Sequence, residues 1–282
     1  MPATIDRIDL HGQPALQLAT ASGARAVVLL RGAQLVSWTP PGGSERIYLS
    51  ERAILDGSTA VRGGVPVCFP QFAARGPLPR HGFVRTMPWS VETERTGTDF
   101  ALITLRCSDT EATRALWPHR FAAELTIAIE ESRLDLELEI INEDDAPLSF
   151  TGALHTYLRV REVEETRIEG LYGYTYEDST ASGELRHDSG DVLLIEAETD
   201  RIYHDVARPL LLREYDRSLG INQEGFRDVV VWNPWEERCA ALPDMPDRDF
   251  RHMLCVEAAV VHQPIELEPG ASWWGRQTLV AL

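Results

Sequence analysis

The stretch LDLELEI, residues 134–140, carries the strongest structural signal in the chain. Leucine or isoleucine stands at every second position, and aspartate or glutamate stands between them. A period of two is that of a β-strand, whose side chains point alternately to the two faces of a sheet. The apolar row predicts a face in the core, and the acidic row predicts a solvated face.

Further short apolar runs flank this strand on both sides, separated by turns rich in Gly, Pro and Asp. They occupy residues 26–30, 34–38, 47–49, 100–107, 121–130, 148–160, 192–195, 210–214, 229–232, 254–261 and 273–282. We expect one or two helical turns over residues 51–60 and a loop over residues 161–190. No long amphipathic helix, linker or internal repeat is visible. This pattern predicts an all-β protein, a large antiparallel β-sandwich in a single domain spanning residues 1–282.

The composition is that of an acidic soluble globule. Of the 282 residues, 44% are hydrophobic and 25% are charged, which is enough for a core and an ordinary surface. Counting 27 Lys and Arg against 44 Asp and Glu gives a net charge of −17 at pH 7, which makes nucleic acid a poor partner. The N-terminus lacks the basic start and apolar run of a signal peptide, and no apolar run reaches the length of a membrane helix. We therefore expect a cytoplasmic protein without a membrane partner.

The four cysteines have no metal-binding pattern. Cys68, Cys107, Cys239 and Cys255 lie far apart and form neither a CxxC pair nor a Cys/His pair of zinc spacing. We expect them to be reduced thiols in the core, and we expect no metal site.

The segment from Arg62 to Trp89, RGGVPVCFPQFAARGPLPRHGFVRTMPW, differs from the strands around it. It holds four Gly, five Pro, four Arg and one His, and it has neither a helical nor an alternating period. Arg62, Arg80 and Arg85 carry planar, permanent charges that suit a phosphate or a carboxylate, and the glycines allow backbone amides to approach a ligand. The segment is either an anion-binding loop or a surface loop with solvated arginines.

Several motifs, in chain order, carry a family resemblance. The segment 62–89 contains RGGVPVCFP and LPRHGFVRTMPW, and later stretches read ALHTYLRV (153–160), ETDRIYHD (198–205), VVVWNPW (229–235) and MLCVEAAVV (253–261). Together they resemble the glucose-6-phosphate 1-epimerase, or hexose-6-phosphate mutarotase, branch of the aldose 1-epimerase family. The resemblance implies the galactose-mutarotase-like supersandwich, with a sugar lying across one concave sheet.

Interconversion of the anomers of an aldose needs a base for the C1 hydroxyl proton and an acid for the ring oxygen. A carboxylate and an imidazole suit these roles, and no metal, nucleotide or redox cofactor is needed. The chain offers Glu257 and His155, each a polar residue in an apolar strand context. On the residues alone, Glu257 could point outward from an edge strand and His155 could be a satisfied core histidine. The resemblance implies that His155 is the general acid and Glu257 the general base.

The resemblance also implies which residues hold the substrate. His81 resembles a histidine that hydrogen-bonds the sugar near the reacting centre, and Asp200 resembles an acidic ligand of a sugar hydroxyl. Arg62 and Arg85 match arginines that clamp the 6-phosphate. Arg80 departs from the family pattern, so it either adds a third phosphate contact or turns outward. On the residues alone, His81 could cap a turn and Asp200 could open one.

Aromatic residues near the last motifs have two interpretations. One interpretation is that the sugar site is lined by Trp232, Asn233 and Trp235, because an aromatic face packs well against a sugar ring. The other is that these residues belong to the core at a strand end. Gln71 replaces an aromatic or other apolar residue that is frequent in the family, so the pocket wall near Phe69 and Phe72 is expected to differ.

Together these features predict a cofactor-independent mutarotase of an aldohexose 6-phosphate, most simply D-glucose 6-phosphate. We expect a monomer whose partner is a small sugar phosphate. Two alternatives stay open. An aldose 1-epimerase of unphosphorylated sugars would use the same acid and base without the arginine clamp. A non-catalytic sugar-phosphate binding protein would use Glu257 and His155 only as ligands.

Overall fold

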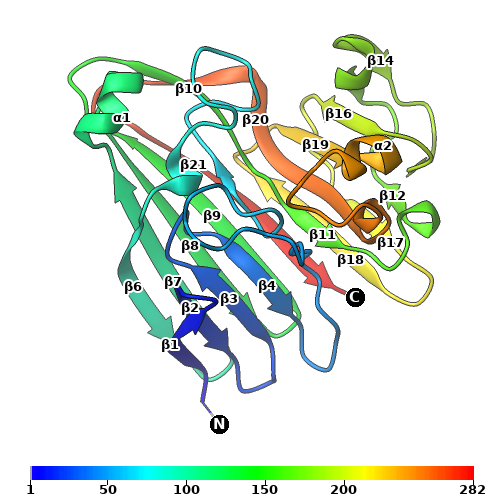
Figure 1. Ribbon diagram of the computed structural model, residues 1–282, viewed down its shortest axis with the longest axis horizontal. Coiled ribbons are helices and arrows are strands. Elements are labelled where there is room, and N and C mark those ends of the chain that lie inside the picture. The colour runs from blue at the N-terminus through cyan, green and yellow to red at the C-terminus, as the bar shows by residue number, and fades with distance from the viewer. Residues whose placement is uncertain (1) are drawn as a thin grey trace.

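The computed structural model describes residues 2–282, and antiparallel β-sheets make up most of it (Figure 1). The first sheet is a four-stranded meander. In spatial order it contains β1 (Thr4–Leu10), β2 (Gln13–Ala19), β3 (Arg25–Leu29) and β4 (Leu35–Thr39).

The largest sheet has nine strands. In spatial order it contains β15 (Val192–Leu194), β12 (Arg167–Glu169), β17 (Leu210–Arg213), β18 (Ser218–Glu224), β21 (Ser272–Ala281), β9 (Arg133–Asn142), β8 (Phe121–Glu130), β7 (Phe100–Ser108) and β6 (Ser90–Thr96). The predicted strand of residues 134–140 is β9, where apolar residues are buried and the acidic residues between them are partly exposed, as the alternation predicts.

The third sheet has eight strands. In spatial order it contains β14 (Glu184–His187), β13 (Thr175–Asp178), β16 (Thr199–Tyr203), β19 (Asp228–Asn233), β20 (Met253–Leu267), β10 (Leu148–Leu154) and β5 (Val67–Cys68), with β11 (Tyr157–Arg159) also paired to β20. The helical elements are short: α1 (Glu111–Leu116), α2 (Trp235–Ala240) and the 3-10 turns η1 (Val84–Thr86), η2 (Val163–Glu165), η3 (Ser179–Ala181) and η4 (Asp249–His252).

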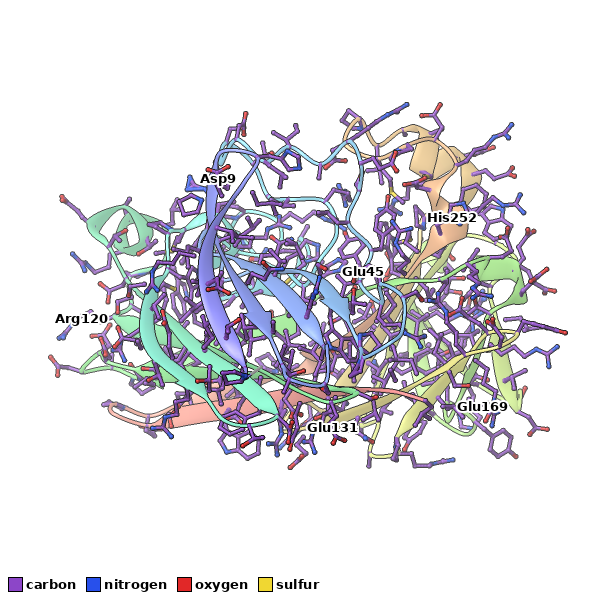
Figure 2. The ribbon with its side chains drawn as sticks, turned by 90° about the horizontal axis from the view of Figure 1, so that it is seen from below. Asp9, Glu45, Arg120, Glu131, Glu169 and His252 are labelled. Carbon is purple, nitrogen blue, oxygen red and sulfur yellow. The ribbon has the colours of Figure 1, made fainter. Side chains whose placement is uncertain are left out.

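The core lies between the sheets. One continuous cluster of buried side chains includes Leu16 of the small sheet, Leu125 and Leu136 of the nine-stranded sheet, and Val231 of the eight-stranded sheet. Viewed from below, the blue strands of the small sheet and the red β21 lie in separate layers (Figure 2). Both smaller sheets thus share the apolar face of the nine-stranded sheet, which confirms the all-β, antiparallel sandwich architecture.

The eight-stranded sheet buries side chains on both of its faces. Every residue of β19 is buried, with Val231 in the main core and Val230 in a second cluster that includes Cys68 and Phe72. Neighbouring strand residues point to opposite faces, so this second cluster lies on the face turned away from the main core. The segment 62–89 covers that face, because it contributes Cys68 and Phe72.

Two local expectations were wrong or incomplete. Residues 51–60 form turns and bends instead of a helical turn, and Gly57 there has a left-handed φ of 78°. Residues 161–190, expected as a loop, contain β12, β13 and β14. These strands are only three or four residues long, and β14 is exposed along its whole length, so they are too short or too polar to show an alternating pattern.

The helices and the cysteines bear on two of the sequence-based predictions. None of the helices in residues 2–282 is long and apolar enough to cross a membrane. Cys68, Cys107, Cys239 and Cys255 are free and buried, as expected of reduced core thiols.

Candidate active site

A cavity of about 420 Å³ lies between the outer face of the eight-stranded sheet and the segment 62–89. Its walls include all seven residues that the sequence singled out: Arg62, Arg80, His81, Arg85, His155, Asp200 and Glu257. They come from one loop, from β16, from β20 and from the junction of β10 with β11. The fold therefore brings together residues that are widely separated in the chain.

Glu257 lies in the middle of the eight-stranded sheet. Its strand, β20, pairs with β19 on one side and with β10 and β11 on the other, and Glu257 is directly opposite Val230 of β19. Val256 and Ala258, its neighbours in β20, point into the main core. The strand alternation therefore points the Glu257 carboxylate into the cavity, where only 1% of the residue is exposed. Asp200 of β16 lies nearby, opposite Trp232.

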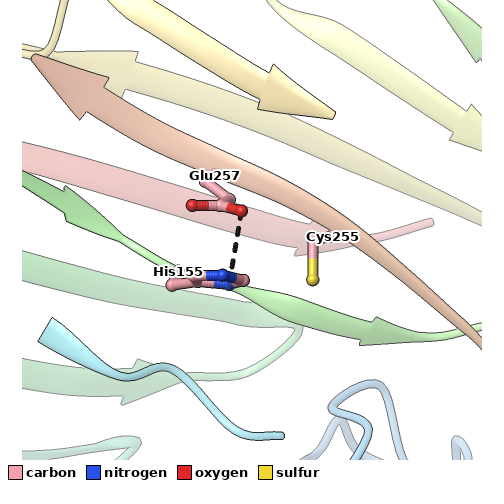
Figure 3. Close-up of side chains that lie close together, drawn as sticks. All are labelled: His155, Cys255 and Glu257. Carbon is pink, nitrogen blue, oxygen red and sulfur yellow. Dashed lines mark ion pairs between the residues drawn. The ribbon is translucent and has the colours of Figure 1, made fainter. Parts of the chain in front are cut away.

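His155 occupies the two-residue gap between β10 and β11. Its backbone N–H donates to the Pro66 carbonyl at 3.0 Å, so the segment 62–89 holds this part of the chain. The imidazole stacks on the Tyr157 ring, with centroids 4.8 Å apart and an interplanar angle of 10°. Its Nδ1 atom lies 3.3 Å from Oε1 of Glu257, as Figure 3 shows.

The two groups of this pair have strongly shifted proton affinities. Burial raises the pKa of Glu257 well above its ordinary value, and the charge of Asp200 raises it further. Burial lowers the pKa of His155 well below its ordinary value, and nearby positive groups, Arg85 and Arg62 among them, add to this shift. Both shifts favour the uncharged forms, the protonated carboxyl of Glu257 and the neutral imidazole of His155, and at 3.3 Å the protonation of one group depends on that of the other.

His81 is held in one tautomer. Its Nδ1 accepts a hydrogen bond from the Ala73 N–H at 3.3 Å and lies 3.2 Å from the Cys68 sulfur. An accepting Nδ1 carries no proton, so the proton of the neutral ring is on Nε2. Burial, followed by the charges of Arg85 and Arg80, lowers the pKa of His81 to about 3. The ring is therefore a neutral hydrogen-bond donor at neutral pH.

Arg62 is fixed by two partners that the sequence analysis did not single out. Its Nε lies 3.2 Å from both carboxylate oxygens of Asp244, and its Nη1 donates to the Tyr157 hydroxyl at 3.1 Å. A second cavity of about 350 Å³ also has Arg62, Arg85 and Tyr157 in its walls. The two arginines thus lie where the two cavities meet.

The other arginines of the main cavity are tethered to different degrees. Arg85 donates from Nη2 to the Arg80 carbonyl at 2.7 Å. Arg75 pairs with Glu177, and Arg238 pairs with Glu198. The Arg80 guanidinium makes no hydrogen bond or ion pair to any residue from 2 to 282 and remains exposed. Arg80 therefore borders the cavity without being fixed in it.

Three buried donors near the cavity are of types that bind metal ions. The ligand atoms of His155, Cys255 and Glu257 all lie within 4.8 Å of one another (Figure 3). Sulfur, imidazole and carboxylate are the donors that zinc accepts, but sulfur binds as the thiolate. Burial, together with the charge of Glu257, raises the pKa of the Cys255 thiol well above its ordinary value. An ion here would have to displace that proton and would occupy both members of the His155–Glu257 pair.

Of the remaining aromatic and amide residues that the sequence singled out, one lines the cavity and the others lie outside its wall. Trp232 lines the cavity. Asn233 is fully buried and donates to the carbonyls of Phe250 and Met253, so it supports the fold. Trp235 begins α2 outside the cavity wall. Gln71 braces its own loop through Leu78, so its departure from the family pattern affects the loop rather than the main cavity.

The chain is similar to known proteins in both sequence and structure. A family model for aldose 1-epimerase matches residues 14–279. A protein of Cenchrus ciliaris named "Putative glucose-6-phosphate 1-epimerase" is 35% identical over 291 residues, which cover 100% of this chain and 86% of that protein.

Solved structures agree with this match. A crystal structure described as a "putative mutarotase" from Salmonella typhimurium has a TM-score of 0.91 and 26% identity, and the alignment covers 98% of this chain and 93% of that chain. A galactose mutarotase-like protein from Clostridium acetobutylicum has a TM-score of 0.81 at 15% identity, with 100% of this chain and 99% of that chain covered, and supports the fold alone. The galactose-mutarotase-like fold expected from the sequence is confirmed.

Proposed function

Because the chain belongs to the aldose 1-epimerase family and is a mutarotase, we propose that it equilibrates the α and β anomers of an aldohexose 6-phosphate, D-glucose 6-phosphate above all. One observation carries the proposal. The His155–Glu257 pair, with 3.3 Å between Nδ1 and Oε1, lines the same cavity as Arg62 and Arg85. An acid–base pair and an anion site within one cavity suit a sugar that carries a phosphate. The name of the Cenchrus ciliaris relative supports the choice of glucose 6-phosphate.

The proposed chemistry acts on two oxygens bonded to the same carbon. In the form of the pair that holds its single proton on His155, Glu257, as the carboxylate, takes the proton of the C1 hydroxyl while His155, as the imidazolium, gives a proton to the ring oxygen. The C1–O5 bond breaks, and C1 becomes an aldehyde. Because both oxygens are attached to C1, the acid and the base have to lie close together, which fits the short His155–Glu257 distance.

Ring closure runs the same proton transfers in reverse. After rotation about the C1–C2 bond, the O5 hydroxyl attacks the other face of the aldehyde. His155 takes back the proton of O5, and Glu257 returns its proton to O1. The pair ends in its starting state, so the cycle balances without an external acid, base or oxidant. The raised pKa of Glu257 makes it a stronger base than an exposed carboxylate.

The proposed substrate contacts follow from the cavity walls. Arg62 and Arg85 bind the phosphate, since planar guanidinium groups form paired, charge-assisted hydrogen bonds with its oxygens. Neutral His81 donates to the sugar near the reacting centre, and Asp200 accepts from a sugar hydroxyl. Arg80, which is exposed and has no partner among residues 2–282, approaches the sugar in this proposal after the sugar has bound.

The test is NMR exchange between the α and β anomer signals of glucose 6-phosphate, with glucose as the comparison sugar. We expect the protein to accelerate exchange of the phosphate ester much more than exchange of glucose. Equal acceleration of both sugars would favour an epimerase of unphosphorylated aldoses. Binding of the ester without any acceleration would favour a sugar-phosphate binding protein.

The same assay tests the base. We expect Glu257→Gln to lower kcat by about 10²- to 10⁴-fold, because the amide cannot accept the C1 hydroxyl proton. Glu139→Gln is the matched control, since Glu139 lies on the partly solvated face of β9. Turnover of Glu257→Gln equal to that of the control would rule out Glu257 as the base.

A further inference from the structure

The strand pairing beside His155 is interrupted at a single hydrogen bond. The strands β10 and β11 keep one register along β20, which places Thr156 opposite Val256. The Val256 N–H donates to the Thr156 carbonyl at 3.1 Å, as in an antiparallel pair. The Thr156 N–H, which would make the reciprocal bond, donates instead to the Leu154 carbonyl at 2.9 Å. The Val256 carbonyl therefore loses its normal donor inside the core.

A glutamine from the opposite sheet replaces that donor. Gln277 of β21 donates from Nε2 to the Val256 carbonyl at 3.0 Å, and its Oε1 accepts from the Thr156 hydroxyl at 2.5 Å. Gln277 is 1% exposed and Thr156 is 0% exposed, so water does not compete for these bonds. One amide thus bridges both sides of the interrupted pair.

The two bridged residues adjoin the proposed acid and base. Thr156 follows His155, and Val256 precedes Glu257. Neighbours in extended chain point to opposite faces, so Thr156 and Val256 face the core while His155 and Glu257 face the cavity. A side chain that holds the core-facing residues also holds the backbone from which the cavity-facing residues project.

We propose that Gln277 is a positioning residue that sets the separation of His155 and Glu257, an inference that rests on the proposed function. An apolar side chain at position 277 would fill the core but leave the Val256 carbonyl without a donor, which is unfavourable in a buried setting. The chain can repair this defect by turning the Thr156 N–H back toward Val256. That rotation moves the peptide that follows His155 and displaces its ring from Glu257.

The test compares Gln277→Met with Gln223→Met. Gln223 of β18 lies directly opposite Gln277, and its Nε2 also donates to backbone carbonyls, those of Val206 and Phe226. Neither carbonyl belongs to a residue next to His155 or Glu257, so the control removes the same kind of bond without changing the backbone beside the pair. We expect kcat of Gln277→Met to fall about tenfold to a hundredfold, with KM for glucose 6-phosphate close to wild type and an altered pH profile of kcat. Gln223→Met should lose stability only.

A second measurement does not depend on activity. The ¹⁵N signals of the His155 ring should shift in Gln277→Met and stay in place in Gln223→Met. Wild-type protein that does not accelerate anomer exchange would overturn the proposed function, and the ring signals would still decide the role of Gln277. Unchanged kcat, pH profile and ring signals in Gln277→Met would overturn the inference.

If Gln277→Met does not fold, a conservative pair at position 156 decides the question. Thr156→Val removes the hydroxyl that donates to Gln277, whereas Thr156→Ser retains it. We expect the serine variant to keep most of kcat and the valine variant to lose it. Equal kcat values in the two variants would contradict the proposal.

Discussion

Arg62 is oriented before any ligand arrives. Asp244 holds its Nε and the Tyr157 hydroxyl holds its Nη1, so the guanidinium has little freedom left to lose on binding an anion. The Nη2 group takes part in neither bond and is available for a phosphate oxygen. Asp244 and Tyr157 are thus expected to contribute to anion binding through Arg62.

Replacing Arg62 should impair recognition of the phosphate more than the chemistry. We expect Arg62→Gln to raise KM for glucose 6-phosphate about tenfold to a hundredfold, the worth of hydrogen bonds to a charged group, while turnover of glucose stays the same. Arg52→Gln is the control, because Arg52 pairs with Asp247 at the surface. An equal loss of activity toward both sugars in the anomer-exchange assay would show that Arg62 does not recognise the phosphate.

The pH dependence should report the charge of the bound phosphate. Burial lowers the pKa of His155 most, and the charges of Arg85 and Arg62 lower it further. A phosphate that neutralises these arginines removes their part of the shift, so the pKa of His155 rises in the complex. The acid form then persists to higher pH. We therefore expect kcat to fall at a higher pH than kcat/KM on the basic side of the two pH profiles.

Glucose provides the control for this shift, because it brings no negative charge to the arginines. For glucose, kcat and kcat/KM should therefore fall at the same pH on the basic side. A basic limb of kcat for glucose 6-phosphate at or below that of kcat/KM would contradict the expected effect.

Among the elements, the segment 62–89 depends on one close backbone approach. Gly82 has a φ of 69° and forms a parallel bridge with Phe69. A Cβ atom on Gly82 would lie 1.9 Å from the Phe69 carbonyl oxygen, a contact that only backbone movement can relieve. His81, the preceding residue, also has a left-handed φ, of 62°. The shape of this turn therefore determines where the His81 ring lies.

Gly82→Ala should damage both stability and the site. We expect it to lower the free energy of unfolding by at least about 3 kcal/mol, because it combines left-handed strain with a backbone clash. Gly12→Ala is the control, since Gly12 has a φ of 85° but no atom within 4 Å of an added Cβ. That variant should lose only about 1–2 kcal/mol, the cost of the left-handed conformation. Urea unfolding measures both, and similar losses would argue against the close approach.

In the molecule as a whole, the two large sheets have different roles. The main cavity is lined by the eight-stranded sheet, α2, η3 and the segment 62–89, and among the described residues none of its lining belongs to the nine-stranded sheet. That sheet supplies the core-facing support instead. Gln277 is a polar link between this support and the proposed acid–base pair.

Mild changes in the supporting core should therefore affect stability without affecting catalysis. Ile127 of β8 is 0% exposed within the main cluster. We expect Ile127→Val to lower the free energy of unfolding by about 0.5–1.5 kcal/mol and to leave kcat and KM for glucose 6-phosphate unchanged. Thermal unfolding and the anomer-exchange assay are the measurements. A clear rise in KM would show that the two sheets are coupled beyond the Gln277 bridge.

Much of this architecture could be predicted from local patterns. The alternation at residues 134–140 indicated the half-buried strand β9 because the pleat of a strand sends neighbouring side chains to opposite faces, whatever surrounds it. The motifs around His81, His155 and Glu257 carried the family resemblance and, with it, the candidate residues. The short, charged strands β12 to β14 were not predicted, because their pairing depends on neighbours in space rather than on a pattern in their own sequence.

The contacts that complete the site depend on the tertiary structure. Asp244 and Gln277 look like ordinary polar residues in the sequence, since nothing near either one predicts its partner. Asp244 meets Arg62 only when the loop after α2 reaches the segment 62–89, and Gln277 meets Thr156 only when the two large sheets pack face to face. Periodicity is a local property that neighbouring residues create, whereas these bonds arise from long-range packing that brings distant parts of the chain together.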